Sequence, residues 1–304
     1  LDPIWEYAGI SSAESAGLAH EIARNPEGRT ATLSTSHALA IVISSGQIDS
    51  IALPLTNTGT SETSVRLHIR QATHLRDFGA APSHEHSLAA FNETMTPGQS
   101  TITFKPAKPI LCEPNAPVVL ILESNADLSW ALSWQEPPGT QTAYWDESLG
   151  YWRWMHGTLG FDLSPVSMPY AAINVLSGIT RPEVGTNLWI SDPQQDLPQT
   201  LAIHWPDPIE ISQIELTFDS QLSGWIWEGA FPLIAQNYDV EICDPSTNQW
   251  QTVASIEDNV QRRRLHRFGT QRTTALRITI RATQGGRTAR IVEVRAYAET
   301  SPAE

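Results

Sequence analysis

The chain has 304 residues, of which 40% are hydrophobic and 17% charged, and its formal net charge is -14. This composition is typical of a globular protein with a core; it excludes a disordered chain, and the length favours two domains. No apolar run approaches the ~18 residues of a membrane span, so no membrane partner is expected. The acidic balance likewise opposes binding to nucleic acid.

The first ten residues, LDPIWEYAGI, lack the basic and apolar regions of a signal peptide, so none is expected in this chain. Cys112 and Cys243, the only cysteines, lie far apart and predict two reduced thiols rather than a disulfide framework. Neither feature indicates the cellular compartment of the protein. A secreted or periplasmic location is favoured if the chain binds glycans.

Residues 11–25 (SSAESAGLAHEIARN) carry the one clear helical signal, with a capping-box spacing at Ser11 and Glu14. After Pro26 the chain reads as short strands between turn residues. The strands alternate with a period of two, as in VRLHIR at 65–70 and LRITIR at 276–281, which is typical of half-buried β-strands.

We predict an all-β protein with two tandem antiparallel β-sandwich domains of jelly-roll-like topology and a short N-terminal helical segment. A break with two prolines at 164–169 separates the two strand series. The predicted boundaries are 1–26 for the linker and helix, 27–165 for the first sandwich and 166–304 for the second.

Eleven tryptophans are the first candidate signal for a binding site. Sugars stack their C–H faces on indole rings and need polar partners for their hydroxyl groups, so a carbohydrate site is an aromatic platform with a polar fringe. Trp130 and Trp134, which share one face of a strand, and Trp189 are expected in the core. The better platform candidates lie in YWRWMHG and SGWIWEGAF, because glycines and charged neighbours predict loops there. These candidates are Trp152, Trp154, Trp225 and Trp227.

Arginine is the second signal. Ten of the 17 arginines fall between residues 262 and 295, where Glu293 is the one acid. In QRRRLHRF (261–268), a strand would place Arg262, Arg264 and His266 on one face and Arg263 on the other. Because the first set lacks apolar members, we expect it to face solvent or a ligand. The alternatives are a polar fringe for sugar, a docking surface, and an ion-pair ladder with acids of the neighbouring strand.

The second domain resembles discoidin, or coagulation-factor-5/8 type C, domains, which are galactose-binding-like and occur as carbohydrate-binding modules. The resemblance rests on NVLSGITRPEVGTNLWISDP (174–193), LPQTLAIHWPDPIEISQIELTFD (197–219) and the closing ARIVEVRAYA (289–298). It implies a β-sandwich and a sugar-binding role. Arg181 and Asn187, in the opening segment, are further candidate ligand-binding residues.

The same resemblance implies a structural Ca²⁺, held by loop carbonyls near the opening turn and by a glutamate in the last strand. Glu293 matches that glutamate. At the opening turn, Ser177 stands where the family usually has an aspartate before the glycine, which weakens the site because Ca²⁺ prefers charged oxygen ligands. No other cofactor is expected.

A further resemblance runs through the whole chain. NVLSGITRPEVGTNLWISDP, QRRRLHRF and ARIVEVRAY are similar to the C-terminal, non-catalytic region of bacterial FAD-dependent oxidoreductases. The flavin-binding half is not part of this sequence, since no GxGxxG follows a strand. The resemblance implies an accessory region next to a catalytic domain in the same parent chain.

The sequence offers no nucleophile motif of the G-x-S-x-G type, and its adjacent carboxylates point to opposite faces of a strand. We therefore predict that this chain is not an enzyme. The main hypothesis is a carbohydrate-binding region that targets an attached enzyme to a polysaccharide or oligosaccharide. The alternative is a structural or oligomerisation region of a FAD-dependent oxidoreductase with no glycan binding of its own.

Overall fold

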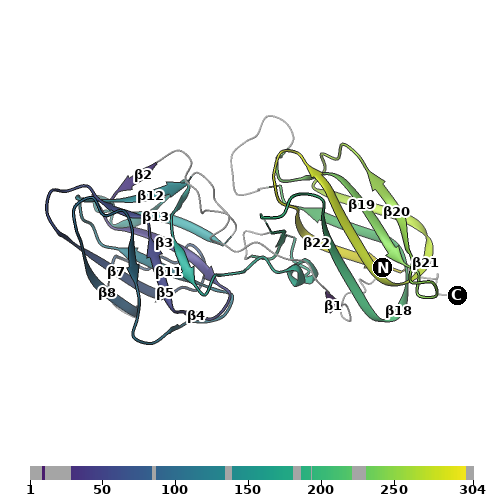
Figure 1. Cartoon of the computed structure of the whole chain (residues 1–304), viewed down its shortest axis with the longest axis horizontal. Helices are drawn as coiled ribbons and strands as arrows, with labels where there is room; N and C mark the ends of the chain where they lie inside the picture. Colours follow the sequence, from purple (N-terminus) through teal and green to yellow (C-terminus); the bar gives the residue numbers. More distant parts are fainter. Residues whose placement is uncertain are drawn as a thin grey trace. The chain divides into compact units, whose positions relative to one another are not determined.

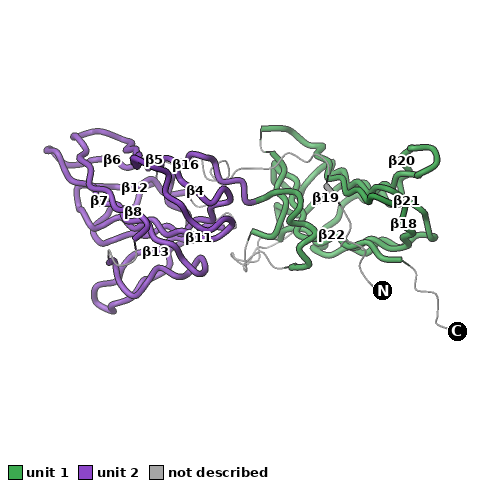
Figure 2. The backbone as a smooth tube through the Cα atoms, turned by 90° about the horizontal axis from the view of Figure 1, so that it is seen from below, with its two compact units in different colours: residues 1–16, 170–304 green, residues 17–169 purple. Residues whose placement is uncertain are grey.

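The computed structural model describes residues 9–10, 29–83, 87–133, 139–180, 186–192, 194–220 and 231–298. The chain divides into two compact units, residues 17–169 and residues 170–304 with residues 1–16 (Figure 2). We call their described parts the first and the second sandwich. The predicted helix at 11–25 lies outside the described residues. No helix of the described chain is long and apolar enough to cross a membrane.

The described chain is built almost wholly from antiparallel strands, which confirms the all-β prediction (Figure 1). The strands of the first sandwich are β2 (Thr30–Thr32), β3 (His37–Ile43), β4 (Gln47–Ile48), β5 (Ser50–Leu53), β6 (Leu55–Asn57), β7 (Thr63–Gln71), β8 (Ser87–Met95), β9 (Ile102–Phe104), β10 (Ile110–Leu111), β11 (Ala116–Leu122), β12 (Leu128–Ser133), β13 (Thr140–Asp146), β14 (Tyr151–Met155), β15 (Thr158–Leu159) and β16 (Asp162–Ser164).

The largest sheet of the first sandwich has the order β14-β13-β3-β11-β7-β8, and shorter sheets formed by the remaining strands complete the unit. In β7, Val65, Leu67 and Ile69 are fully buried, as the period of two predicts. His68 on the other face is also buried, so this strand is not half-buried as expected. All seven residues of β3 are buried. This sheet is therefore covered on both faces, the second face by a cluster that includes Phe78.

The elements of the second sandwich are β1 (Gly9–Ile10), the 3-10 helix η1 (Ala172–Leu176), β17 (Trp189–Ile190), β18 (Gln199–Phe218), β19 (Ala235–Cys243), β20 (Trp250–Ile256), β21 (Arg263–Thr283) and β22 (Arg290–Tyr297). They form one sheet in the order β17-β22-β18-β21-β19-β20, and β1 pairs with β18.

Strands β18 and β21 are so long that each belongs to both layers of the second sandwich. The C-terminal part of β18 pairs with β22 and the first residues of β21, whereas its N-terminal part pairs with residues 275–280 of β21. Register shifts at 204/209 and 211/213 mark the bend between the two parts. Phe218 and Tyr238 then meet across the interior, with ring centroids 5.1 Å apart.

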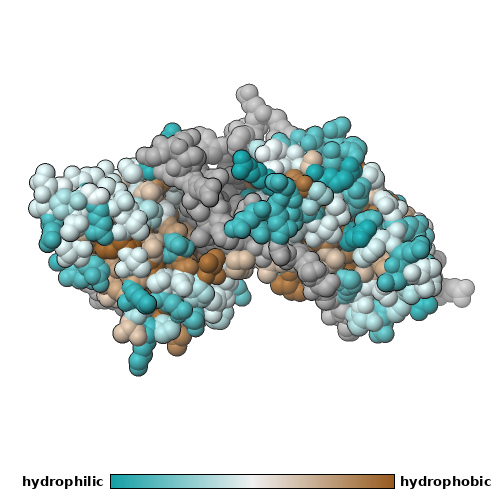
Figure 3. Space-filling view, in the orientation of Figure 1, coloured by the Kyte–Doolittle hydropathy of each residue, from teal (hydrophilic) through white to brown (hydrophobic). Residues whose placement is uncertain are grey.

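Trp130 and Trp189 are fully buried, as predicted, and each lies in the core of its own sandwich. Trp134 lies outside the described residues. The outer surfaces are mostly polar. On the face shown in Figure 3, hydrophilic and neutral residues predominate in both units and apolar residues form small separate areas. Large apolar side chains that are more than half exposed include Leu111, Leu149, Trp154, Ile173 and Val260.

Candidate functional site

Two of the predicted tryptophans, Trp152 and Trp154, lie on an exposed hairpin of the first sandwich. They belong to strand β14 and not to a loop, so the loop prediction was wrong here. In the β13–β14 pairing, Trp145 lies opposite Trp152 and Ala143 lies opposite Trp154, so Trp152 and Trp154 share one face of β14, as predicted. Trp154 is 55% exposed, whereas Trp152 is half-buried. The ring of Trp152 packs against Trp145 and Phe78, with centroid distances of 5.5 and 5.9 Å.

The exposed indole of Trp154 has a charged neighbour that the sequence did not point to. The guanidinium carbon of Arg76 lies 4.1 Å from the centroid of the Trp154 ring, within cation–π distance. No carboxylate of the described chain forms an ion pair with Arg76. The guanidinium therefore lies over one face of an indole whose residue is 55% exposed.

The loop that carries Arg76 is fixed by hydrogen bonds. Asp77 accepts a hydrogen bond of 2.5 Å from Nη2 of Arg70, and its second oxygen accepts bonds of 2.9 Å from N and Oγ1 of Thr73. Burial raises the pKa of Asp77, but the bonds from Thr73 and Arg70 outweigh this effect and lower it. Phe78 then anchors the loop in the apolar cluster beneath Trp152. The loop therefore presents Arg76 in a defined position.

The opposite face of the same hairpin is also aromatic and polar. Tyr151 is 50% exposed. Arg153 pairs with Asp146 at 3.3 Å and lies 5.8 Å from the centroid of the Tyr144 ring. Since Arg153 is paired with a carboxylate, this face has a neutral fringe, unlike the face that carries Trp154.

The QRRRLHRF stretch is oriented the other way round from the prediction. The predicted solvent-facing set is the inner one: His266 is 6% exposed, and Arg262 and Arg264 are partly buried. Arg263 and Arg267 are exposed on the outer face. The expectation that a row without apolar members faces solvent was wrong here, because polar groups elsewhere in the fold satisfy these side chains.

His266 and Tyr238 form a buried hydrogen bond. The Nε2 atom of His266 lies 3.1 Å from the hydroxyl oxygen of Tyr238, and their rings meet edge to face. Burial, with a smaller contribution from Arg264, lowers the pKa of His266 to about 4. Burial also raises the pKa of Tyr238. The phenol therefore keeps its proton, the imidazole is neutral, and one hydrogen bond joins the two side chains.

The other inner side chains of this stretch also bind within the fold. Nη1 of Arg264 donates to Oδ1 of Asn259 at 3.0 Å, and Asn259 donates in turn to the carbonyl oxygen of Ala235 at 2.8 Å. Nη2 of Arg262 donates to the carbonyl oxygen of Thr180. These contacts join the stretch to the opening segment and to β19.

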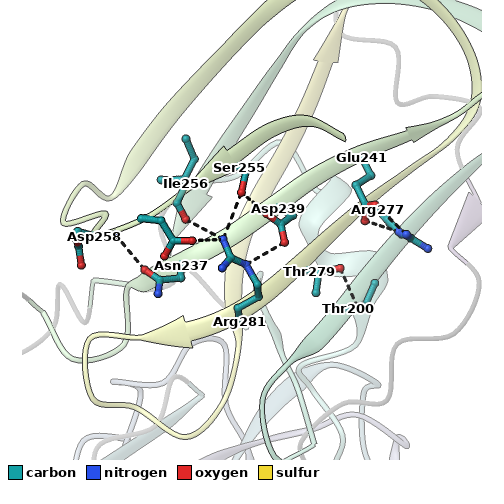
Figure 4. A network of polar contacts seen from close by, with 11 residues as sticks. Thr200, Asn237, Asp239, Glu241, Ser255, Ile256, Asp258, Arg277, Thr279 and Arg281 are labelled. Carbon is teal, nitrogen blue, oxygen red and sulfur yellow. Dashed lines mark hydrogen bonds and ion pairs between the residues drawn. The ribbon is translucent and has the colours of Figure 1, made fainter. Parts of the chain in front are cut away.

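The outer arginines support the ion-pair alternative. Arg263 forms two hydrogen bonds with Glu215 of the neighbouring strand, at 2.6 and 2.8 Å. Farther along β21, Arg277 pairs in the same way with Glu241, at 2.5 and 2.8 Å. Arg281 lies between the carboxylates of Asp239, at 2.9 Å, and Glu257, at 2.6 Å (Figure 4). Much of the basic segment is therefore neutralised within the second sandwich.

Asn187, a predicted ligand-binding residue, is 9% exposed and helps to close the opening segment. Its Nδ2 donates to the carbonyl oxygen of Ile179 at 2.5 Å. Its Oδ1 is buried and has no hydrogen-bond partner in the described chain. Arg181 and the tryptophans Trp225 and Trp227 lie outside the described residues. Their predicted roles stay predictions.

The predicted Ca²⁺ ligands, Glu293 and Ser177, lie near the same turn. Glu293 is 1% exposed and pairs with Arg295 at 2.6 Å. The Oγ atom of Ser177 accepts a bond of 3.3 Å from the backbone N of Ile179. The described residues provide one carboxylate here, and a guanidinium already neutralises it. A carboxylate that is already neutralised is a poor ligand for Ca²⁺, so these described donors do not fit the ion.

A second buried ion pair joins the start of β22 to the residue that follows β18. Arg290, 9% exposed at its side chain, lies 3.4 Å from Asp219, whose side chain is 2% exposed. Nε of Arg290 also donates to Oγ1 of Thr288 at 3.2 Å. Sequence reasoning missed this pair, because the two residues are 71 positions apart and no pattern links one to the other.

No family model and no curated protein sequence matches the chain. Solved structures with similarity to it include a family 32 carbohydrate-binding module from Streptococcus pneumoniae EndoD, at 12% identity and TM-score 0.36. This match covers 43% of this chain and 86% of the module. A family 32 module from Clostridium perfringens NanJ, in complex with galactose, matches at 18% identity and TM-score 0.32, covering 41% of this chain and 82% of the module.

A chitosan-binding module of a chitosanase/glucanase from Paenibacillus sp. IK-5 matches at 14% identity and TM-score 0.34. It covers 43% of this chain and 86% of its own. Each match thus accounts for less than half of the chain, and at these identities and TM-scores it carries no argument about a ligand. The resemblance to flavoenzyme accessory regions stays a prediction.

Proposed function

We propose that this chain is a non-catalytic carbohydrate-binding region, and that the Trp154 indole of the first sandwich is a platform for a sugar ring. The observation that carries the proposal is the exposed indole of Trp154 beside the guanidinium of Arg76, which has no ion-pair partner in the described chain. An exposed indole leaves a large apolar area in water, and covering that area with a ligand is favourable.

The chemistry of this pair suits a sugar. The C–H groups of one sugar face carry partial positive charge and pack on the electron-rich face of an indole. The N–H groups of Arg76 are donors for hydroxyl oxygens at the edge of the ring. The hydrogen-bonded loop around Asp77 and the packing of Trp152 against Phe78 hold both groups in place. Little conformational entropy is then lost on binding.

The role that follows is to hold an attached enzyme on a polysaccharide, with the catalytic domain elsewhere in the same parent chain. Such binding works without an acid, a base or a nucleophile. A reducing-sugar assay on the isolated chain tests this part, since release of sugar ends would show catalysis.

Affinity gel electrophoresis against a panel of soluble polysaccharides tests the binding. The panel includes chitosan and galactose-containing polymers, since these sugars are named for two of the similar structures. Retardation of the native chain is expected, and Trp154→Ala is expected to weaken it at least tenfold, about 1.4 kcal/mol. Tyr151→Ala is the matched control, because it removes an equally exposed ring from the opposite face of the strand.

Equal effects of the two substitutions, or none, would refute the platform. Loss of retardation in Trp225→Ala alone would move the site to the second sandwich while keeping the function. No retardation on any glycan, together with dimers in solution, would favour the structural and oligomerisation role.

A further inference from the structure

One guanidinium links the last strand of the second sandwich to its opening turn. Arg295 and Glu293 lie two residues apart on β22, so their side chains leave the same face of the strand. Oε1 of Glu293 accepts a bond of 2.6 Å from Nη2 of Arg295. The same Nη2 lies 3.5 Å from the carbonyl oxygen of Gly178, in the turn that follows η1.

This link stabilises a buried charge. The side chain of Glu293 is 1% exposed, and that of Arg295 is 26% exposed. A carboxylate so deeply buried needs a positive partner, because the fold removes its hydration. The bond to Glu293 raises the pKa of Arg295, so the guanidinium stays charged.

A calcium ion at this place would have to use the same carboxylate and the same turn. Two buried oxygen atoms of this region are neutral. They are Oγ1 of Thr217, which lies opposite Glu293 in the β18–β22 pairing, and Oδ1 of Asn187, whose Nδ2 binds Ile179 beside Gly178. A guanidinium at 2.6 Å cancels the charge that would attract Ca²⁺ and repels a second cation.

We propose that Arg295 takes the role of the cation in this sandwich: its guanidinium joins Glu293 to the Gly178 turn, and the domain closes without bound calcium. One oxygen of Glu293, Oε2, has no hydrogen-bond partner in the described chain. A cation bound to that atom is therefore the outcome that would contradict the proposal.

Calorimetry of the full chain with excess EDTA or with millimolar CaCl₂ is the first test, and equal unfolding midpoints are expected in both. The second test is Arg295→Met, which keeps the length of the side chain and removes its charge. Its midpoint should fall by roughly 5–15 °C, because the carboxylate stays buried without a partner. Arg272→Met is the matched control, since Arg272 is an exposed arginine without an ion pair in the described chain.

Two further variants keep the proposal testable if Arg295→Met does not fold. Arg295→Lys restores a cation and should keep most of the stability, whereas Arg295→Met with Glu293→Gln should recover part of the loss by removing the buried charge. A midpoint of the native chain that falls in EDTA, or equilibrium dialysis that finds one calcium per chain, would overturn the proposal. So would an Arg295→Met midpoint equal to that of Arg272→Met.

Discussion

Replacing His266 by glutamine is expected to make the second sandwich less sensitive to acid. In the folded protein, burial lowers the pKa of His266 to about 4. In the unfolded chain the imidazole has its ordinary pKa of about 6.5. Between these two values the unfolded chain binds a proton at this residue and the folded chain does not. Protonation therefore favours unfolding as the pH falls through this window.

The size of the effect follows from the two pKa values. A pKa difference of about 2.5 units means that neutral His266 contributes about 3.4 kcal/mol to the free energy of unfolding at high pH. About 3 kcal/mol of this contribution has been lost at pH 4. The contribution of His266 is fully present above pH 6.5 and falls progressively toward pH 4. Glutamine does not titrate in this range, so the difference in free energy of unfolding between native chain and variant should narrow by about 3 kcal/mol from pH 7 to pH 4.

Urea unfolding at a series of pH values measures this difference. Other groups that titrate, including the buried His37, whose pKa burial also lowers, cancel when the two proteins are compared. Tyr238→Phe separates the effect of burial on the pKa of His266 from the effect of the hydrogen bond. It removes the hydrogen bond but keeps the burial, so the acid sensitivity should remain. Parallel curves for the native chain and His266→Gln from pH 7 to pH 4 would refute the reasoning.

Two further predictions concern stability. Arg290→Met should lower the free energy of unfolding by about 3–5 kcal/mol in urea, because it breaks a buried ion pair, whereas Met at the exposed Arg287 should change it by less than about 0.5 kcal/mol. Gly157→Ala should lower it by more than about 2 kcal/mol, because the added Cβ overlaps the carbonyl oxygen of Ser133 at a positive φ of 89°. Gly98→Ala, at a φ of 75° but with open space around the Cβ, should cost only about 1 kcal/mol. Equal losses within either pair would contradict the argument.

The strands were predictable from the sequence where one side of the alternation is strongly apolar. Leu276, Ile278 and Ile280 are fully buried, as their period of two predicts. A strand with such an apolar row has one stable orientation, since turning it over would expose all three side chains. The burial of Trp130 and Trp189 followed from the same reasoning.

The orientation of QRRRLHRF was not predictable, because both of its faces are polar and only distant partners decide between them. His266 lies inside because the hydroxyl of Tyr238 meets it there, and Arg263 lies outside because Glu215 does. The pairing of Arg76 with Trp154 was not predictable for the same reason. Arg76 and Trp154 are brought together by a loop and a hairpin that are far apart along the chain, and neither residue carries a motif that would indicate the other.

The passage of β18 and β21 through both layers of the second sandwich has a consequence for how this domain folds. Its most extensive pairing joins residues 199–217 to residues 263–280, so the chain must close a long loop before either layer can form. A domain dominated by such distant pairings is expected to fold in milliseconds to seconds. Neither layer can open without disrupting the two strands that it shares with the other. Amide hydrogens of both layers should therefore exchange with solvent through one common global opening.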